Sequence, residues 1–303
     1  MHRSKSLVGL LTGMTMLIPL MIISGASVQV RAQTTITCDV SAIATATSSQ
    51  VAASPVAREA HPFPENPGTV TVFAAASLTD AFGAIEADLE AATPGLDLVF
   101  NFAGSQALAT QLTEGAQAEV FASANMTQMR NAVEAGVISG SPETFVSNRL
   151  AIVVPSDNPA GIASPADLAT DGVQLVMAAE DVPIGQYARE SLCLMGEDTA
   201  TYGEGFVDSV SANIVSNETN VRNVLAKVQL GEADAGIVYI SDVTAEVADA
   251  VTMIEIPNEV NRIATYPIAP VEGGNQENAA AFISYVLSSA GQATLAEYGF
   301  QAP

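Results

Sequence analysis

The sequence predicts an α/β protein of two lobes, in which each lobe has a mainly parallel sheet flanked by helices. Between about Asn66 and Pro303, short apolar runs rich in β-branched residues alternate with segments of helical period. This alternation is typical of parallel strands joined by crossover helices. A folded region of about 235 residues also exceeds one ordinary domain, so two lobes with a crossing near Arg149 are expected.

Residues 1–32 are predicted to be a secretory signal peptide. Arg3 and Lys5 precede an uncharged apolar run from Leu7 to about Val28, which is the order of charge and hydrophobicity found in such peptides. The run is also long enough to cross a bilayer, so a retained membrane anchor is the alternative. No other stretch is long and apolar enough to span a bilayer, so under both interpretations the rest of the chain is expected to be soluble.

Residues 33–66 are expected to form a flexible tether, because Ala, Ser, Thr, Val and Pro dominate there without a sustained period. His61 lies in this segment and His2 lies in the predicted signal, so the folded body has no histidine. Neither a Ser-His pair nor an imidazole metal site can therefore be built in the body.

The chain has two cysteines, Cys38 in the predicted tether and Cys193 in the body. In an oxidising compartment a disulfide between them is one expectation. Two unpaired thiols are the other, because sequence does not report the distance between the residues. Lipid attachment at Cys38 is disfavoured, since Ile36-Thr37 is a poor lead-in to a lipidated cysteine.

The chain is strongly acidic, with 10 basic and 33 acidic residues and a net charge of −23. Removal of residues 1–32 takes away Arg3, Lys5 and Arg31 and no acid, which leaves 7 basic against 33 acidic residues and a net charge of −26. Nucleic acid and anionic membranes are therefore poor partners. An anionic ligand would be repelled at long range, so it would need short-range neutral donors.

The first element of the body is the stretch from Val70 to Asp80. Val72 and Phe73 predict a buried strand, three alanines follow, and Ser77 stands where an amphipathic helix is expected to begin. The turn between strand and helix leaves backbone N–H groups free, and together with the helix dipole and the Ser77 hydroxyl these suit an anion. Ser77 taken alone is as consistent with a simple N-cap.

The later elements continue the alternation. Strands are expected at 96–102, 119–124, 150–155, 173–177, 214–215, 235–239, 252–257 and 266–270, and helices at 106–112, 129–136, 186–192, 221–230, 278–287 and 295–298. Ser105 repeats the pattern of small residues and a serine at a helix start, and Thr219 or Asn220 is the expected N-cap of the helix at 221–230. Tyr239 ends a strand, where open α/β sheets bind ligands.

Five motifs, in this order, resemble the periplasmic molybdate-binding proteins of ABC transporters, which are type II periplasmic-binding proteins. They are Val-Phe-Ala-Ala-Ala-Ser-Leu-Thr at 72–79, Phe-Ala-Gly-Ser at 102–105, Val-Pro-Ile-Gly-Gln-Tyr-Ala at 182–188, Asn-Val-Arg at 220–222 and Gly-Ile-Val-Tyr-Ile-Ser-Asp at 236–242. Each motif is weak alone, but their order over about Val70 to Phe300 is specific.

The resemblance implies a periplasmic-binding-protein fold with the ligand cleft between the lobes, residues 67–148 and 263–303 forming the first lobe and 149–262 the second. A tetrahedral oxyanion would be held by neutral donors. Ser77 and Ser105 would give hydroxyl and backbone donors, Ile184 and Val221 backbone N–H groups, and Tyr239 its phenolic hydroxyl. The family commonly has a smaller residue where this chain has Ile184, so the pocket volume could differ.

The function implied is capture of molybdate, with tungstate also accepted, and delivery to a membrane permease driven by an ATPase. The protein is expected to be a monomer in the periplasm or on the outer face of the cytoplasmic membrane. No catalytic residue, cofactor or direct metal ligand is expected. The alternatives are another tetrahedral oxyanion such as sulfate or phosphate, and an exported hydrolase with Ser77 as nucleophile, which lacks a histidine base.

Other side chains near the motifs are assigned supporting roles. Arg222 is expected to face the acidic surface or to brace the cleft, and Tyr187 and Tyr266 to serve as packing or hinge residues. Carboxylates inside the cleft would repel an anion. Solvated or helix-capping roles are therefore expected for Glu180, Asp181 and Asp242.

Overall fold

The computed structural model describes residues 35–38 and 59–303 of the chain. Its strands are β1 Gly68–Ala75, β2 Leu96–Ala103, β3 Val120–Ala122, β4 Glu143–Pro155, β5 Leu175–Ala178, β6 Ile214–Glu218, β7 Ala235–Tyr239, β8 Val251–Glu255 and β9 Ile263–Pro270. Its α-helices are α2 Thr79–Ala92, α3 Ser105–Thr113, α4 Met126–Glu134, α5 Pro183–Glu197, α6 Thr199–Tyr202, α7 Phe206–Asn213, α8 Val221–Gln229, α9 Gln276–Val286 and α10 Ser289–Glu297. Short 3₁₀ turns lie at η2 Ala76–Leu78, η3 Pro165–Ala169 and η4 Ile240–Asp242.

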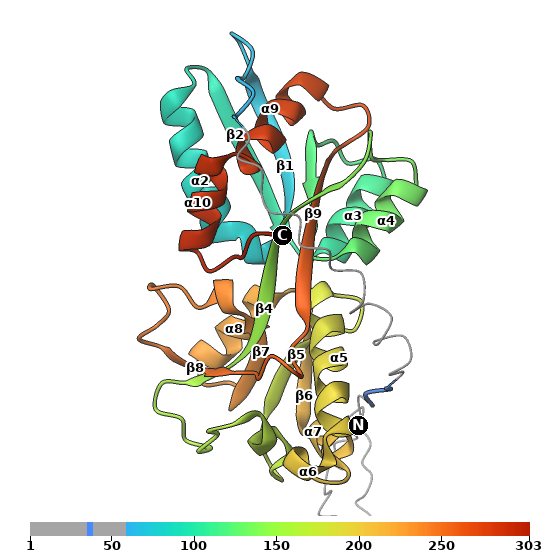
Figure 1. Ribbon diagram of the computed structural model, residues 1–303, viewed down its shortest axis with the longest axis vertical. Coiled ribbons are helices and arrows are strands. Elements are labelled where there is room, and N and C mark those ends of the chain that lie inside the picture. Colours follow the sequence, from blue (N-terminus) through green and yellow to red (C-terminus); the bar gives the residue numbers. More distant parts are fainter. Residues whose placement is uncertain (1–34, 39–58) are drawn as a thin grey trace, which may run out of the picture. The chain divides into compact units, whose positions relative to one another are not determined.

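These elements form the two lobes of an α/β fold, joined by the long strands β4 and β9 (Figure 1). In the first lobe β2, β1 and β3 are parallel, and in the second β6, β5 and β7 are parallel. The predicted parallel strands are therefore present in both lobes. The joining strands differ: β9 runs antiparallel to β3, and β4 runs antiparallel to β9, β7 and β8.

Strand β4 changes partner at the predicted crossing. It pairs with β9 as far as Arg149 and with β7 and β8 from Leu150 and Ala151 onward. One continuous strand therefore contributes to the sheets of both lobes. The division into 67–148 with 263–303 and 149–262 stays a prediction, and we use it below to name the first and second lobe.

The core forms where the sequence pattern is most periodic. The helix face predicted after Ser77 is buried at Ala81, Phe82, Ile85 and Leu89. Phe82 packs against Phe100, Phe145 and Phe282 with ring centroids 5.6–6.1 Å apart. Fully burying one such side chain stabilises a fold by about 1.5–3 kcal/mol, so this aromatic cluster anchors α2, β2 and α9 around one end of β4.

The prediction of a flexible tether over 33–66 is wrong at residues 35–38. Ile36 is 5% exposed and its N–H donates to Ser211 Oγ at 3.2 Å, and Cys38 forms a disulfide with Cys193 of α5. Closer to β1, the His61 N–H donates to Ser284 Oγ. The open question of the two cysteines is thus settled in favour of the bridge.

The predicted signal peptide lies outside the described residues, as does the tether between 39 and 58. Within residues 35–38 and 59–303, no helix is both long and apolar enough to cross a membrane.

Candidate functional site

All five sequence-predicted site residues lie around one small cavity between the lobes. Its volume is about 10 Å³, which is room for roughly one water-sized sphere. The first lobe lines it with Ala75, Ala76, Ser77, Ala103, Gly104, Ser105 and Ala124, and the second with Val182, Pro183, Ile184, Asn220, Val221 and Tyr239. Because both lobes line the cavity, a ligand held there would contact both lobes at once.

Ser77 lies in the 3₁₀ turn η2, between β1 and α2. Helix α2 begins at Thr79 and not at Ser77, because one tight turn precedes it, so Ser77 does not cap that helix. The side chain is 3% exposed, and its hydroxyl is 2.9 Å from the hydroxyl of Tyr266. The hydroxyl therefore lies in the cavity wall with one hydrogen-bond partner behind it.

Ser105 is the first residue of α3, and no side chain caps that helix. The first N–H groups of a helix have no acceptor within it, so those of α3 are available at the cavity. The Ser105 hydroxyl oxygen accepts a hydrogen bond from the Ala124 N–H at 3.0 Å, which leaves its hydrogen free to donate. Side chain and backbone thus both offer hydrogens.

Ile184 lies in the first turn of α5, which begins at Pro183, three residues before the predicted start. Pro183 has no N–H, and no side chain caps the helix, so the N–H groups of Ile184 and Gly185 are the first available donors. Arg189 holds this turn in place by donating to the carbonyls of Ala178 at 2.9 Å and Gly185 at 2.8 Å.

Val221 is the first residue of α8, and Asn220 is its N-cap, accepting from the Asn223 N–H at 3.1 Å. Of the two predicted caps, Asn220 is therefore the correct one. The cap occupies the third N–H of the helix and leaves the first, that of Val221, for the cavity.

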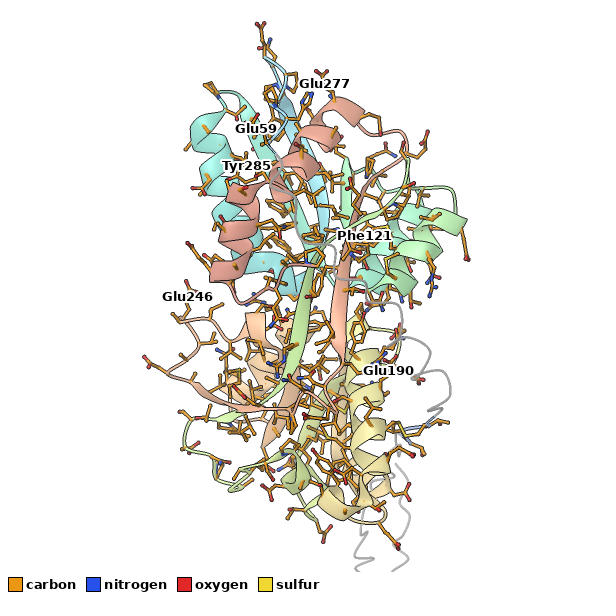
Figure 2. The ribbon with its side chains drawn as sticks, in the orientation of Figure 1. Glu59, Phe121, Glu190, Glu246, Glu277 and Tyr285 are labelled. Atoms are coloured by element: carbon orange, nitrogen blue, oxygen red, sulfur yellow. A yellow bond between two sulfur atoms is a disulfide. The ribbon has the colours of Figure 1, made fainter. Side chains whose placement is uncertain are left out.

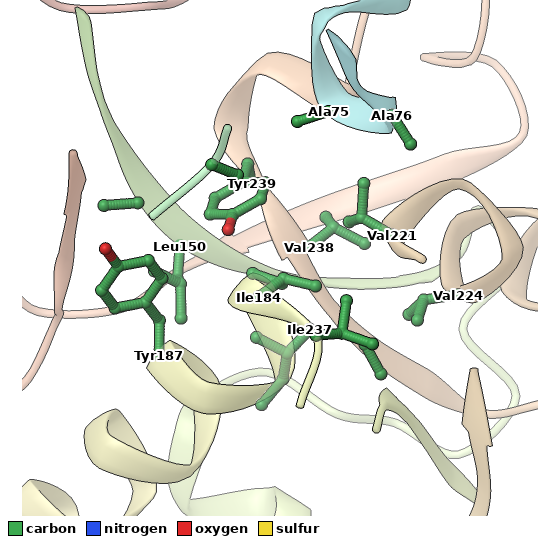
Figure 3. Close-up of a cluster of buried hydrophobic side chains, with 14 of the residues drawn as sticks. Ala75, Ala76, Leu150, Ile184, Tyr187, Val221, Val224, Ile237, Val238 and Tyr239 are labelled. Carbon is green, nitrogen blue, oxygen red and sulfur yellow. The ribbon is translucent and has the colours of Figure 1, made fainter. Parts of the chain in front are cut away.

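Tyr239 ends β7 and is 1% exposed. Its hydroxyl has no hydrogen-bond partner among the described residues. Figure 3 shows this hydroxyl on the side of the ring that faces Ile184, and Ala75 and Val221 line the same cavity. Burial raises the pKa of Tyr239 well above its ordinary value, so the phenol keeps its hydrogen and is available as a donor. A buried donor without a partner is uncommon and indicates a ligand that supplies the acceptor.

The cavity wall contains no Lys, Arg, Asp or Glu among the residues that the structure describes. The exposed acids lie elsewhere, as Glu59, Glu246 and Glu277 do at the margins of Figure 2. Several helix N-termini and hydroxyl hydrogens therefore make the cavity locally positive without a formal cation.

Arg222 lies next to the cavity and braces the lobes. From α8 its guanidinium reaches Asp80 of α2 at 2.6 Å and the Ala76 carbonyl at 3.3 Å, and its Nε is 3.5 Å from Asp242. Of the two expected roles, the brace is the correct one.

Asp242 is fully buried, so the solvated role predicted for it is wrong. The capping role is correct, because its Oδ2 accepts the Tyr239 N–H at 3.0 Å in the turn η4. Burial raises the pKa of Asp242 to about 7, against the lowering effect of Arg222. Glu180 and Asp181 are exposed, as expected.

Further polar contacts join the lobes around the cavity. Gln106 donates to the Thr219 carbonyl at 2.9 Å, Asn125 to Gln186 at 3.1 Å, and Gln128 to the Asp181 carbonyl at 3.0 Å. A Cβ added to Gly104 would lie 2.4 Å from the Thr219 carbonyl oxygen, so the backbones of the two lobes approach each other closely there. The structure is thus a closed state of the cleft.

Sequence reasoning missed two features of the site. The first is that Ala124, two residues after the end of β3, lines the cavity. The second is the contact between Ser77 and Tyr266, a residue that was expected only to pack or to serve the hinge. The two residues are 189 positions apart in the chain. No local signal could have revealed that contact.

Two lobes that close over a small cavity of neutral donors define a solute-binding protein. The chain belongs to the family of bacterial extracellular solute-binding proteins, whose model matches residues 70–301. The predicted family is thereby confirmed.

Individual relatives refine this picture. The molybdate-binding protein ModA of Mycobacterium tuberculosis (strain ATCC 25618 / H37Rv) is 39% identical over 236 residues, which are 78% of this chain and 85% of the relative. The periplasmic molybdate-binding protein of Azotobacter vinelandii has a similar fold, with a TM-score of 0.67 and 17% identity over 77% of this chain and 99% of that one. The sulfate-binding protein SubI from M. tuberculosis H37Rv has a TM-score of 0.69 and 17% identity over 78% of this chain and 87% of that one.

Proposed function

We propose that the protein binds molybdate in the cavity between its lobes and delivers it to the membrane permease of an ABC transporter. The observation that carries the proposal is a cavity of about 10 Å³ whose polar lining consists of hydrogen-bond donors and whose Tyr239 hydroxyl has no partner among the described residues. The donors are the hydroxyls of Ser77, Ser105 and Tyr239 and the N–H groups near Ile184 and Val221.

The energetics favour a compact anion at such a place. Stripping water from a doubly charged anion is costly, and one helix N-terminus returns only about 0.3–2 kcal/mol. Hydrogen bonds to charged groups add roughly 1.5–3 kcal/mol each, so a cluster of five donors can offset the loss of hydration. Because these donors are neutral, they would hold the anion without a formal positive charge inside the cleft, although the protein surface is strongly acidic.

The choice of molybdate rests on sequence and not on fold. Solved structures with this fold include a molybdate-binding and a sulfate-binding protein, both 17% identical to this chain, so the fold alone does not select an anion. The relative at 39% identity is a molybdate-binding protein, and this likeness supports molybdate. Tungstate, which has the same shape and charge, is proposed as a second ligand.

We propose that the chain is exported and works in the periplasm or at the outer face of the cytoplasmic membrane, in keeping with its extracellular solute-binding family. The proposed role is binding and release by a monomer without turnover. The Ser77 hydroxyl has Tyr266 as its partner and no histidine occurs in residues 66–303, so the serine lacks the usual general base.

Thermal unfolding in the presence of molybdate, tungstate, sulfate and phosphate tests the proposal. A ligand at 100 times its dissociation constant adds about 2.7 kcal/mol of stability. We expect this shift with molybdate and tungstate, and a much smaller one with Tyr239→Phe, which removes the unpartnered donor but keeps the ring. A shift with sulfate and none with molybdate would overturn the assignment.

A further inference from the structure

Tyr266 lies behind Ser77 and not in the cavity wall. It belongs to β9, one of the two strands that join the lobes, and is fully buried. Edge-on contacts with Phe145, Tyr239 and Phe300, at centroid distances of 5.5–6.2 Å, fix its ring. Its hydroxyl reaches Ser77 Oγ at 2.9 Å, but the residue is absent from the cavity lining. Any effect of Tyr266 on a ligand must therefore pass through Ser77.

The hydrogen bond between these two hydroxyls has a preferred direction. Burial raises the pKa of Tyr266 above its ordinary value, so the phenol keeps its hydrogen. The Tyr239 hydroxyl has no hydrogen bond of full geometry, but it lies close enough to lower this pKa, which is the effect of a group that directs its hydrogen toward the phenol oxygen and not of an acceptor. If Ser77 donated, the phenol hydrogen would be buried without an acceptor, which costs about 1–3 kcal/mol. Tyr266 therefore donates and Ser77 Oγ accepts.

The amide of Asn148 supports the same direction. Its Oδ1 accepts the Arg149 N–H at 2.9 Å, and its Nδ2 donates to Ser241 Oγ at 2.8 Å. Its proximity lowers the pKa of Tyr266, as a donated hydrogen does. Asn148 thus offers the phenol oxygen a hydrogen and not an acceptor, and the phenol hydrogen is left for Ser77.

We propose that Tyr266 is a positioning residue that fixes Ser77 as a hydrogen-bond donor toward the cavity. With its oxygen engaged by Tyr266, Ser77 directs its hydrogen to the ligand, in the same way as Ser105, whose oxygen accepts from the Ala124 N–H. Both serines then donate and neither accepts. The inference rests on the proposed function and adds a source of selectivity to it.

The selectivity follows from which ligands can donate hydrogen bonds and which can only accept them. A fully deprotonated oxyanion such as molybdate or sulfate only accepts, whereas hydrogenphosphate carries a hydroxyl that must donate. Where both serines are held as donors, that hydroxyl finds no serine oxygen to accept its hydrogen. Removing the Tyr266 hydroxyl frees the Ser77 oxygen. Hydrogenphosphate then gains an acceptor for its hydroxyl hydrogen, whereas molybdate loses a donor that was oriented toward it.

A double-mutant cycle tests the proposal by calorimetric titration with molybdate, sulfate and phosphate. We expect Tyr266→Phe to weaken molybdate binding by about 3- to 10-fold and to lower the ratio of molybdate to hydrogenphosphate affinity by about tenfold. In a Ser77→Ala background, Tyr266→Phe is expected to change affinity by less than about twofold, because its effect passes through the serine. Tyr187→Phe is the matched control, since its buried hydroxyl accepts from the neighbouring Thr265 N–H and does not contact Ser77.

The outcomes separate this inference from the proposed function. Equal effects of Tyr266→Phe with and without Ser77, or an equal loss for molybdate and phosphate, would mean a merely structural role and would overturn the inference while molybdate binding stands. If the protein bound sulfate but not molybdate, and sulfate binding showed coupling between Tyr266 and Ser77, the proposed ligand would be overturned and the inference supported. A wild-type protein that binds none of the three anions would overturn both. Unfolding midpoints of the unliganded variants verify that each one folds.

Discussion

The two lobes meet at one cavity but leave their polar groups in different states. In the first lobe each serine oxygen has a partner: Ser77 has Tyr266 and Ser105 has the Ala124 N–H. In the second lobe the Tyr239 hydroxyl has no partner, and the Asp242 carboxylate is fully buried with one oxygen lacking a hydrogen bond. The two serines of the first lobe are therefore prepared before a ligand arrives, whereas Tyr239 and Asp242 of the second lobe keep polar atoms that a ligand or a proton relieves. Away from these serines the first lobe also has buried oxygens without partners, at Gln106 and Asn278.

This difference indicates which residues lower the stability of the unliganded protein for the sake of binding. Buried polar groups without partners cost about 1–3 kcal/mol each, and proteins retain them where function requires them. If the comparison holds, substitutions that remove the unpartnered groups of Tyr239 or Asp242 should stabilise the unliganded protein or change its pH dependence, and substitutions of Ser77 or Ser105 should not.

The largest expected effect comes from the buried carboxylate. The pKa of Asp242 is about 7 in the folded protein, against an ordinary value of 3.8. Between these values the unfolded chain has released this proton and the folded protein keeps it, so stability falls as pH rises and then levels off above pH 7. The total change is on the order of 4 kcal/mol.

Asp242→Asn removes this titration, so the difference in unfolding free energy between wild type and variant should change from pH 4 to pH 7 and be constant above it. Urea unfolding across this range measures the difference. The groups that face the carboxylate are Arg222 and Asp80, and both are kept in the variant so that only the titration of Asp242 is removed. A difference independent of pH would contradict the assigned cost in the second lobe.

The second prediction concerns a substitution that displaces the N–H donors of the second lobe at the start of α5. A Cβ at Gly185 would lie 1.9 Å from the Ala179 carbonyl oxygen, so Gly185→Ala must displace the first turn of α5. Loss of the N–H donors near Ile184 should weaken anion binding by about 100-fold, equivalent to roughly 2.7 kcal/mol. Calorimetric titration with molybdate measures the loss.

Gly83→Ala in α2 of the first lobe is the matched control. Nothing lies within 4 Å of the added Cβ there, so the same substitution should stabilise the helix by about 0.5–1 kcal/mol and leave affinity unchanged. Equal affinities for the two variants would mean that the start of α5 does not contribute donors.

Local chemistry made much of the architecture predictable. The β-branched run before Ser77 and the helical spacing after it gave β1 and α2, and the expected strand at 235–239 matches β7 in its bounds. The five site residues came from the resemblance to the molybdate-binding family, and their places at strand ends and helix starts agree with it. Helix α7 and the first half of β4 had no clear pattern and were missed.

The remaining errors concern contacts between distant segments. The segment at Ile36 and Cys38 has the composition of a tether, yet 155 residues separate the two bridged cysteines and only the folded chain brings them together. For Asp242 the sequence left a solvated and a capping role open, and only the contacts with β7 and with the arginine of α8 decide for the buried, capping one. Composition describes a residue's preference and not the surroundings that the fold imposes on it.

The smallest expected effect concerns the brace between the lobes. Arg222→Gln removes the ion pair from α8 to Asp80 across the cleft, and because both side chains are about a quarter exposed the pair should contribute only about 0.2–1 kcal/mol. We expect a dissociation rate for molybdate up to about fivefold faster, since the closed state loses one contact. Lys227→Gln on the same helix is the control, because its partner Glu218 lies in the same lobe at 2.7 Å, and breaking that pair leaves the closed state unchanged relative to the open one. Stopped-flow dissociation measures both rates, and equal rates would mean that Arg222 stabilises its own lobe and not the closure.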